Sequence, residues 1–506
     1  MKDRHYTQLF LYCALLYLVF LWNVPLLDPD EPVYGETAKE MLATGDWLSP
    51  RIYGDFWYDK PPLFYWLEAV SFSMFGISTF TARLPSALIG MGTVLYLYRE
   101  AKAVWGERVA FLSALIFASS LETVILARSA VTDMTLTAAL TAAMLGFLRR
   151  KYAAAYIACG LALLAKGPIG FGFPALIVGL WLLLRKQFTW KPILSLRWYW
   201  GIPLACLVGL PWYLYMTAHH GAPFVDTFLG YHNITRFAEP EHAGRDHWWL
   251  YFIVLTAGCY PWTGAAFGLW HRAKSWRKQP EVLYLMVWAL FIFIFFSASS
   301  TQLFSYIFPM FPPLAILSAL YLTEAVQSGR KAFACLHIFF GTLVAAALSL
   351  APLMPIGGLA AKYAFPLLLL LCTFGGTAFW LKGRLSRFCL TQAAAALILV
   401  FGVWTLYAPA VTEDFTSAYI SAKLKETALD PSRTLYIDPF YRPNAAFYHD
   451  LYGKALPLPM KGNPPPSEPS YILVQKKVYE DWHPEERASL HVVWETKTAL
   501  LLVSQS

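Results

Sequence analysis

The chain has 506 residues, of which 57% are hydrophobic and only 14% are Asp, Glu, Lys or Arg, and its mean hydropathy is +0.46. Soluble globular proteins carry about 25% charged residues, so this composition excludes an ordinary soluble protein and indicates a polytopic membrane protein. The formal net charge is +8. In a membrane protein the positions of the positive residues along the chain say more than this total.

Apolar stretches long enough to cross about 30 Å of hydrocarbon recur through the first 410 residues. They predict an α-helical polytopic membrane domain over residues 1–410 with about thirteen transmembrane helices. The stretches lie at 6–24, 80–98, 108–127, 132–148, 152–165, 168–184, 198–218, 248–270, 281–298, 303–323, 332–352, 363–381 and 388–409.

Alternate connections between these stretches are basic. The N-terminus and the segments 99–108, 149–151, 185–197, 272–278, 330–331 and 382–387 are rich in Lys and Arg. Positive residues hold loops on the cytoplasmic side of a membrane, so we expect the N-terminus and these segments to be cytoplasmic. The loops 25–79 and 219–247, and everything after residue 410, then lie on the outer side.

The outer parts of the chain differ in character. Loop 25–79 contains two short stretches, 33–43 and 62–75, with apolar residues at helical spacing, and we expect helices there that lie along the membrane surface. From residue 411 to 506 the composition becomes polar, and the runs 433–438, 471–475, 490–495 and 499–503 are typical of strands. We therefore predict a small outer α/β domain over 411–506.

Acidic residues stand close to the predicted spans. Asp30 and Glu31 follow the first span by a few residues, and Asp133 begins a later one. Acids are costly near hydrocarbon and persist there for a partner or a reaction. For Asp133 the alternative is a helix-start acid favoured by the helix dipole. For Asp30 a function is favoured more strongly, because Pro29 and Pro32 stiffen the backbone on either side of it.

Several cations are unusual because they fall on the predicted outer side. They are Lys60, Arg83, Arg128, Lys166 and Arg236. Cations gathered among acids are well suited to recognition of a phosphate group. The alternative for any single one is a residue that extends along the interface to keep its charge in water.

Histidines are concentrated in the loop 219–247, which holds His219, His220, His232, His242 and His247 of the 11 in the chain. This concentration suggests metal or proton chemistry, but the spacings match no closed zinc motif, and solvated histidines are the alternative. The chain has no P-loop, glycine-rich dinucleotide turn, nucleophile elbow or zinc box. We therefore expect no nucleotide cofactor and a reaction on lipid-borne, pre-activated substrates.

Together the motifs resemble a known family. In chain order they are Asp30-Glu-Pro-x-Tyr34-x-Glu36, Asp59-Lys60-Pro-Pro-Leu-Phe-Tyr-Trp66, Arg128 to Asp133-Met, Leu-Ala-Lys166-Gly-Pro, His232-x-x-x-Arg236-Phe and Ser299-Ser to Tyr306-Ile-x-Pro309. They resemble those of the polyprenyl-phosphate-dependent glycosyltransferases of the protein O-mannosyltransferase superfamily, specifically the bacterial lipid A 4-amino-4-deoxy-L-arabinose transferase group. The resemblance covers essentially all of 1–410.

The resemblance implies a GT-C membrane fold and an inverting glycosyltransferase in the bacterial inner membrane, with a periplasmic C-terminal domain. Its substrates would be a polyprenyl-phosphate-linked sugar and lipid A, another glycolipid or a protein; membrane lipids would be further partners, and nucleic acid would not be one. By residue it implies Asp30 and Asp133 as catalytic carboxylates, Lys60, Tyr306, Lys166 and Arg128 at the donor phosphate, and Glu31, Tyr34 and Arg236 beside them. A divalent metal, Zn or Mg, would be held by Asp59, His232 and His449.

The chain departs from the group at three positions. The group commonly has Arg where this chain has Val33, Glu where it has Asp59, and Lys where it has Gln302. Valine cannot replace the bidentate phosphate contact of an arginine, so we expect donor binding to differ here.

Two other classes of function remain open from the residues. In a proton-coupled transporter or lipid flippase the acids would form a proton relay and the outer loop a gate. An assembly protein would use the domain 411–506 to bind a partner, but it would not account for the acids and cations upstream.

Overall fold

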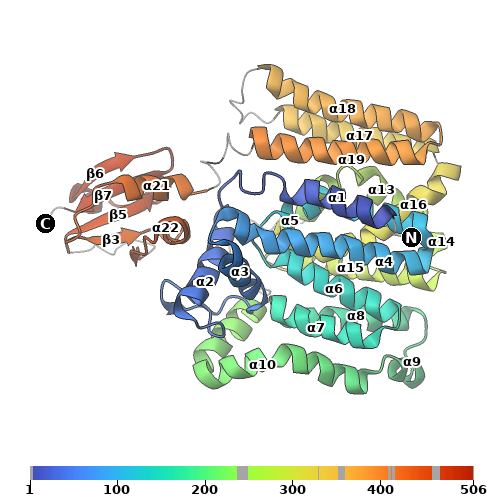
Figure 1. Ribbon diagram of the computed structural model, residues 1–506, viewed down its shortest axis with the longest axis horizontal. Coiled ribbons are helices and arrows are strands. Elements are labelled where there is room, and N and C mark those ends of the chain that lie inside the picture. Colours follow the sequence, from blue (N-terminus) through green and yellow to red (C-terminus); the bar gives the residue numbers. More distant parts are fainter. Residues whose placement is uncertain are drawn as a thin grey trace.

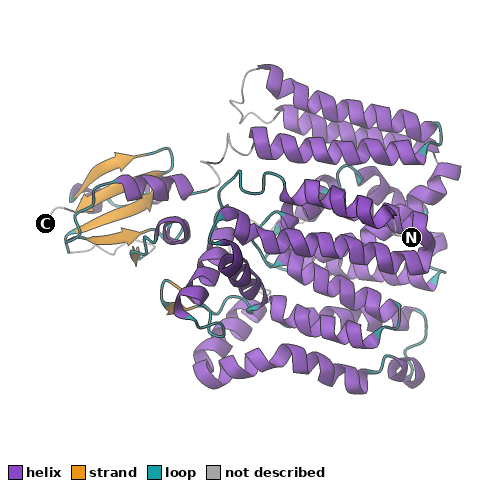
Figure 2. Ribbon diagram, in the orientation of Figure 1, coloured by secondary structure: helices purple, strands orange, loops and turns teal. Residues whose placement is uncertain are grey.

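The computed structural model describes residues 4–235, 249–328, 330–350, 359–407, 412, 416–457 and 468–504. Long helices run side by side in a bundle, with the N-terminus at one end and a small domain beyond the other (Figure 1). Helices make up the bundle, whereas strands gather in the small domain, apart from one short pair beside the bundle (Figure 2). This arrangement confirms the predicted helical membrane protein with a small C-terminal α/β domain.

The first half of the bundle is built from residues 4–184. Its helices are α1 (Arg4–Leu18), α4 (Thr79–Ser119), α5 (Leu121–Ala127), α6 (Asp133–Leu148), α7 (Tyr152–Lys166) and α8 (Ile169–Leu184). Inside α4, Gly106 has a non-helical backbone with φ 82° and ψ 171°, which only glycine adopts without strain. The stretch is therefore two helical arms that meet at Gly106, as the two predicted spans 80–98 and 108–127 require.

The second half continues with α9 (Trp190–Ser195), α10 (Trp198–Phe224), η1 (Val225–Thr235), α12 (Leu250–Gly258), α13 (Thr263–Gly268), η2 (Leu269–His271), α14 (Ala273–Trp276), α15 (Pro280–Ser297), η3 (Phe304–Met310), α16 (Phe311–Ser328), α17 (Arg330–Leu350), α18 (Leu359–Leu381), α19 (Leu385–Gly402) and η4 (Val403–Tyr407). The predicted span 248–270 is not one straight helix. The axis bends by 119° between the pieces Leu250–Gly258 and Thr263–His271.

Within the described residues, six helices are long and apolar enough to cross a membrane, and the bent pair would make a seventh. Five shorter apolar helices accompany them, namely Leu63–Phe75, Asp133–Leu148, Tyr152–Lys166, Ile169–Leu184 and Lys331–Ala347. The first helix ends at Leu18, six residues before the predicted end of its apolar stretch. The protein is thus a multi-pass membrane protein, and each predicted stretch overlaps one or more of the described helices.

Small residues let helices in this bundle approach closely. On α7, a Cβ added at Gly160 would lie 2.7 Å from the carbonyl oxygen of Ala205 on α10. On α10, a Cβ at Gly209 would lie 3.0 Å from the Gly160 carbonyl oxygen. Because lipid is as apolar as the side chains, contact between membrane helices depends on such close packing.

The loop between α1 and α4 forms a layer at the end of the bundle that faces the small domain (Figure 1). It consists of α2 (Asp30–Thr44), the antiparallel strands β1 (Arg51–Ile52) and β2 (Asp55–Phe56), and α3 (Leu63–Phe75). Both helices begin at a proline that cannot donate a backbone hydrogen bond, Pro29 before α2 and Pro62 before α3.

The C-terminal domain contains α21 (Ala418–Glu426), β3 (Thr434–Ile437), α22 (Arg442–His449), β4 (Lys454–Ala455), β5 (Ser470–Gln475), α23 (Lys476–Glu480), α24 (Pro484–Ala488), β6 (Leu490–Glu495) and β7 (Ala499–Ser504). The strand order is β4-β3-β5-β7-β6, with β3 parallel to β4 and β5, and β7 antiparallel to β5 and β6. Side chains alternate between two apolar clusters: Leu473 and Leu501 belong to one, Ile472 and Leu502 to the other.

Candidate active site

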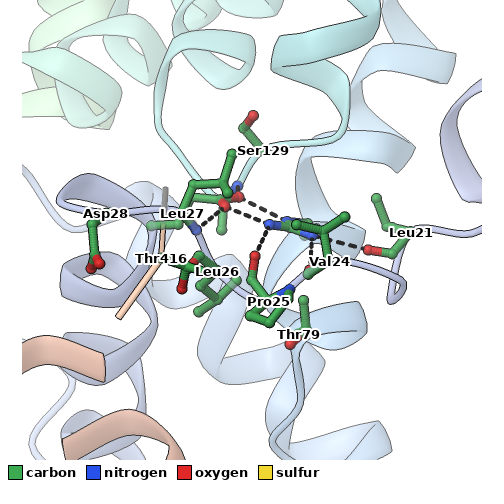
Figure 3. A network of polar contacts seen from close by, with 12 residues as sticks. Leu21, Val24, Pro25, Leu26, Leu27, Asp28, Thr79, Ser129 and Thr416 are labelled. Atoms are coloured by element: carbon green, nitrogen blue, oxygen red, sulfur yellow. Dashed lines mark hydrogen bonds and ion pairs between the residues drawn. The ribbon is translucent and has the colours of Figure 1, made fainter. Parts of the chain in front are cut away.

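A buried ion pair holds the start of α2 in place (Figure 3). The Arg83 guanidinium on α4 donates to both carboxylate oxygens of Glu31, over 2.8 and 2.6 Å. Glu31 also accepts from the backbone amides of Leu27 and Ala130, each over 2.7 Å. Its carboxylate is therefore fully used inside the protein, which makes Glu31 an anchor of the loop.

The same guanidinium caps the chain that leaves α1. Arg83 donates to the carbonyl oxygens of Leu21, Val24 and Pro25 over 3.1, 2.7 and 2.8 Å. These carbonyls belong to the irregular segment that follows α1, where no regular backbone hydrogen bonds satisfy them. Arg83 thus connects α4 to α2 and to the segment that follows α1. Because it fixes Glu31, it also determines the position of the adjacent residue, Asp30.

Asp133 is paired with Lys166. Asp133 begins α6 and Lys166 ends α7, and the Lys166 Nζ lies 2.5 Å from Asp133 Oδ1, with the two side chains 14% and 11% exposed. The ammonium also lies 5.1 Å from the centre of the Tyr306 ring on η3, within the range of a cation–π contact. Three helices thus bring together a carboxylate, an ammonium and a phenol that are distant in sequence.

Asp30 and the pair Asp59–Lys60 lie beside this group. The Lys60 Nζ lies 2.7 Å from Asp59 Oδ1. Asp30 keeps access to solvent, yet desolvation by surrounding protein, followed by repulsion from Asp133, raises its pKa, while Lys60 and Lys166 act in the opposite direction. Residues from α2, α6, α7 and the loop before α3 therefore share one electrostatic site.

Tyr34 lies on α2, one helical turn after Asp30, and faces the same charges. Burial raises its pKa well above the ordinary value, with further contributions from Tyr65, Asp59, Asp133 and Asp30. Its ring lies 5.5 Å from the ring centre of Tyr65. Tyr34 is thus a neutral phenol that forms the apolar wall of the acidic site.

The described contacts of Arg128 are with α1 and η4. Its Nη1 donates to the carbonyl oxygens of Leu16 and Val19 at the end of α1, over 2.8 and 2.9 Å. Its guanidinium lies 4.5 Å from the Trp404 ring centre. These contacts orient Arg128 toward α1 and η4, and its contact with a donor phosphate stays a prediction.

The predicted metal ligands are only partly described. The side chain of His232 and all of Arg236 lie outside the described residues. The pKa of His449 is lowered by partial burial and then by Lys425, and its other charged neighbours are Asp450 and Lys39. Asp59 instead sits against Lys60. In the part of the chain that the structure describes, no three His, Cys, Asp or Glu residues form a group that could hold a metal ion.

The sequence suggested a contact between the first loop and the C-terminal domain only through a metal shared by Asp59 and His449, and it did not predict the hydrogen bonds between them. The backbone amide of Ser417 and the side-chain amide of Asn444 donate to the two Asp28 oxygens over 2.6 and 2.7 Å. Lys39 donates to the Ala446 carbonyl over 2.6 Å. Residues this far apart in sequence carry no local pattern that would pair them; the one available signal was the cluster of acids in the loop.

Comparisons with known proteins agree with this architecture. The family model described as dolichyl-phosphate-mannose-protein mannosyltransferase matches residues 8–220. The crystal structure of ArnT from Cupriavidus metallidurans bound to undecaprenyl phosphate superimposes with a TM-score of 0.79 at 20% identity, covering 99% of this chain and 98% of that one. The fold is therefore that of a GT-C membrane protein.

Two relatives are named undecaprenyl phosphate-alpha-4-amino-4-deoxy-L-arabinose arabinosyl transferase. The protein from Edwardsiella ictaluri is 30% identical over 78% of this chain and 70% of its own length. The protein from Erwinia tasmaniensis is 32% identical over 69% of this chain and 66% of its own length, which is just under two thirds. This chain belongs to the polyprenyl-phosphate-dependent glycosyltransferases of the protein O-mannosyltransferase superfamily.

Proposed function

We propose that this protein transfers a sugar from a polyprenyl-phosphate donor to lipid A, or to another glycolipid or a protein, at the outer face of a bacterial inner membrane. The observation that carries the proposal is the shared electrostatic site of Asp30, Asp133, Lys166, Asp59 and Lys60 at the end of the helix bundle. The names of the relatives and the undecaprenyl phosphate bound to the Cupriavidus protein support the donor class.

In the proposed reaction an acceptor oxygen forms a bond to the anomeric carbon, and the bond from that carbon to the lipid phosphate breaks. The negative charge that develops on the departing phosphate must be stabilised. The Lys60 ammonium is suited to this role, and Lys166 and the Tyr306 hydroxyl could assist it. Attack from the face opposite the phosphate would invert the anomeric configuration.

Asp30 is the proposed base or orienting group for the acceptor. Its raised pKa makes its carboxylate a better proton acceptor than an ordinary aspartate. An acceptor hydroxyl would transfer its proton to Asp30, whereas a phosphate acceptor is already an anion and would need only to be oriented. Asp133 is less available because Lys166 occupies its Oδ1, and it would act by positioning that lysine.

The charge of the site supports an amino sugar. Among the described groups, three carboxylates face two ammonium groups and leave one negative charge unmatched. A polyprenyl phosphodiester brings another negative charge. An ammonium on the sugar, as in the aminoarabinose of the relatives' names, would compensate one of these charges. A neutral sugar would leave both unmatched, at a cost in a partly desolvated site.

A metal would require ligands beyond those that the structure describes. Asp59 is paired with Lys60, and among the described residues no three His, Cys, Asp or Glu side chains form a group that could hold a metal ion. All proposed steps are therefore assigned to side chains of the chain itself.

The proposed orientation places the C-terminal domain in the periplasm and the N-terminus in the cytoplasm. The basic connections around α9 and α14 lie at the same end of the bundle as the N-terminus, opposite the C-terminal domain (Figure 1). This separation of charge supports an orientation with positive loops inside.

Transfer of labelled sugar from synthetic undecaprenyl-phosphate aminoarabinose, in detergent, tests the proposal against lipid A and a glycoprotein acceptor. We expect labelled lipid A with the wild-type protein and none with Asp30→Asn. Wild-type-like turnover by Asp30→Asn would contradict the assignment of Asp30. A protein that gives no product with any acceptor, but moves donor lipid across vesicles when a pH gradient is applied, would be a transporter.

A further inference from the structure

A cleft of about 420 Å³ opens in the C-terminal domain where strands β3 and β5 end. These strands are parallel, so their carboxyl ends lie at the same edge of the sheet. From β3 the chain proceeds through α22 to β4 on one side, whereas from β5 it proceeds through α23 and α24 to β6 on the other side. In α/β proteins such a divergence leaves a crevice at the carboxyl edge, where ligands bind.

The walls of this cleft are held in place by hydrogen bonds. The buried carboxylate of Asp438 accepts from the Phe440 backbone amide over 2.9 Å and from the Gln475 side chain over 3.1 Å. The Tyr441 hydroxyl donates to the Thr498 carbonyl oxygen over 3.0 Å. The cleft is thus formed before any ligand enters, as is usual for small-molecule sites.

The lining combines cations with an exposed aromatic ring. Lys476, Lys477 and Lys497 line the cleft, and the Phe440 side chain at its rim is 39% exposed. Lys476 is paired with the Glu495 carboxylate, whereas Lys477 makes no hydrogen bond or ion pair with any residue that the structure describes. Ammonium groups bind phosphate, and an exposed ring can pack against the apolar face of a sugar.

Two acids also line the cleft, Asp28 and Glu480. The oxygens of Asp28 are occupied by the Ser417 amide and the Asn444 side chain, over 2.6 and 2.7 Å. Desolvation raises the pKa of Asp28 to about 6. Glu480 adds its negative charge near Lys476, whose ammonium is already paired with Glu495. Lys477 is therefore the lining cation that the proposal uses.

Asp28 also places the cleft next to the reaction site. It is separated from Asp30 by one residue, and two residues span at most about 7 Å of extended chain. A ligand in the cleft therefore lies beside the loop that carries the proposed base. An acceptor molecule larger than one sugar can occupy the cleft and still reach Asp30.

We propose that this cleft binds the phosphorylated saccharide headgroup of the acceptor lipid and thereby presents it to Asp30. The inference rests on the proposed sugar transfer and identifies the acceptor class. The cleft, and not the site of Asp30, Lys60 and Lys166, then selects a phosphorylated acceptor.

Steady-state kinetics of the full-length protein test the proposal with Lys477→Glu and Phe440→Ala. Each is expected to raise the KM for phosphorylated lipid acceptor about five- to ten-fold and to leave the KM for the donor within about two-fold. Lys454→Glu, on strand β4 away from the cleft, is the matched control and should match the wild type. Unchanged acceptor KM in both cleft variants would overturn the proposal, as would an equal rise in the KM for a dephosphorylated acceptor.

A direct measurement of ligand binding to the cleft tests this inference independently of the proposed sugar transfer. A hexosamine 1-phosphate should bind the detergent-solubilised wild-type protein and bind Lys477→Glu at least about five-fold more weakly. If no acceptor is glycosylated but this binding is seen, the sugar-transfer proposal fails and the cleft assignment stands. Equal binding of inorganic phosphate and the hexosamine phosphate would overturn the saccharide assignment, and absence of binding by both would overturn the site itself.

Discussion

Replacing Glu31 by alanine should destabilise the fold, because the buried charge of Arg83 would lose its partner. The guanidinium is 2% exposed and would lose both carboxylate bonds, while the amides of Leu27 and Ala130 would lose their acceptor. Removing one member of a buried ion pair typically costs about 3–5 kcal/mol, because the other charge stays buried without compensation. We expect a clear fall in the melting temperature in detergent, measured by intrinsic fluorescence, together with loss of the monodisperse peak in gel filtration.

The double variant Glu31→Met with Arg83→Met sharpens this test. Removing both charges eliminates the uncompensated one, so the double variant should melt above either single variant. Glu468→Ala, which breaks the exposed pair with Lys454, serves as the control and should leave the melting temperature unchanged. A single variant Glu31→Ala that melts within about 1 °C of the wild type would refute the view that this pair anchors the loop.

Three further outcomes are expected. Asp30→Asn should lower kcat by at least about a hundred-fold while the melting temperature stays the same, since the side chain reaches solvent; a parallel loss of stability would indicate a structural role instead. Lys60→Met should raise the donor KM about ten-fold, with Lys186→Met at the opposite end of the bundle as control; an effect on acceptor KM alone would contradict phosphate binding. Burial raises the pKa of Glu36 from 4.5 to about 7, so the neutral form stabilises the fold at low pH and this contribution is lost as the pH rises through about 7. Glu36→Gln should therefore be more stable than the wild type at pH 8 by up to about 3 kcal/mol, and similar at pH 4; equal melting curves across this range would refute the shift.

The membrane class could be read from composition, because about 30 Å of hydrocarbon admits only long apolar helices. The strands of the C-terminal domain were predictable for a similar reason: its two apolar clusters impose a two-residue alternation on β5 and β7. Asp30 could be selected as a candidate because it follows an apolar span, and its catalytic role stays a prediction. These features depend on residues that are neighbours in sequence.

The partners of the charged residues could not be predicted in the same way. Glu31 and Arg83 are separated by 52 residues, Asp133 and Lys166 by 33, and Asp28 and Asn444 by 416. Which partner a buried charge meets depends on the rotation and crossing of packed helices, which no local pattern encodes. For the same reason the bonds from Arg128 to the carbonyls of α1 could not be foreseen, while its contact with a donor phosphate stays a prediction.

The sequence by itself determined that this is a many-helix membrane protein with an acidic first loop and a small α/β domain, because solvent and lipid act on each segment separately. Tertiary structure alone decided that Glu31 serves as an anchor while Asp30 stays accessible, although they are adjacent. It also placed Asp28 in the lining of a cleft of the C-terminal domain. Both outcomes follow from the same physical cause: a carboxylate near hydrocarbon must be paired, and only the packed fold supplies the partner.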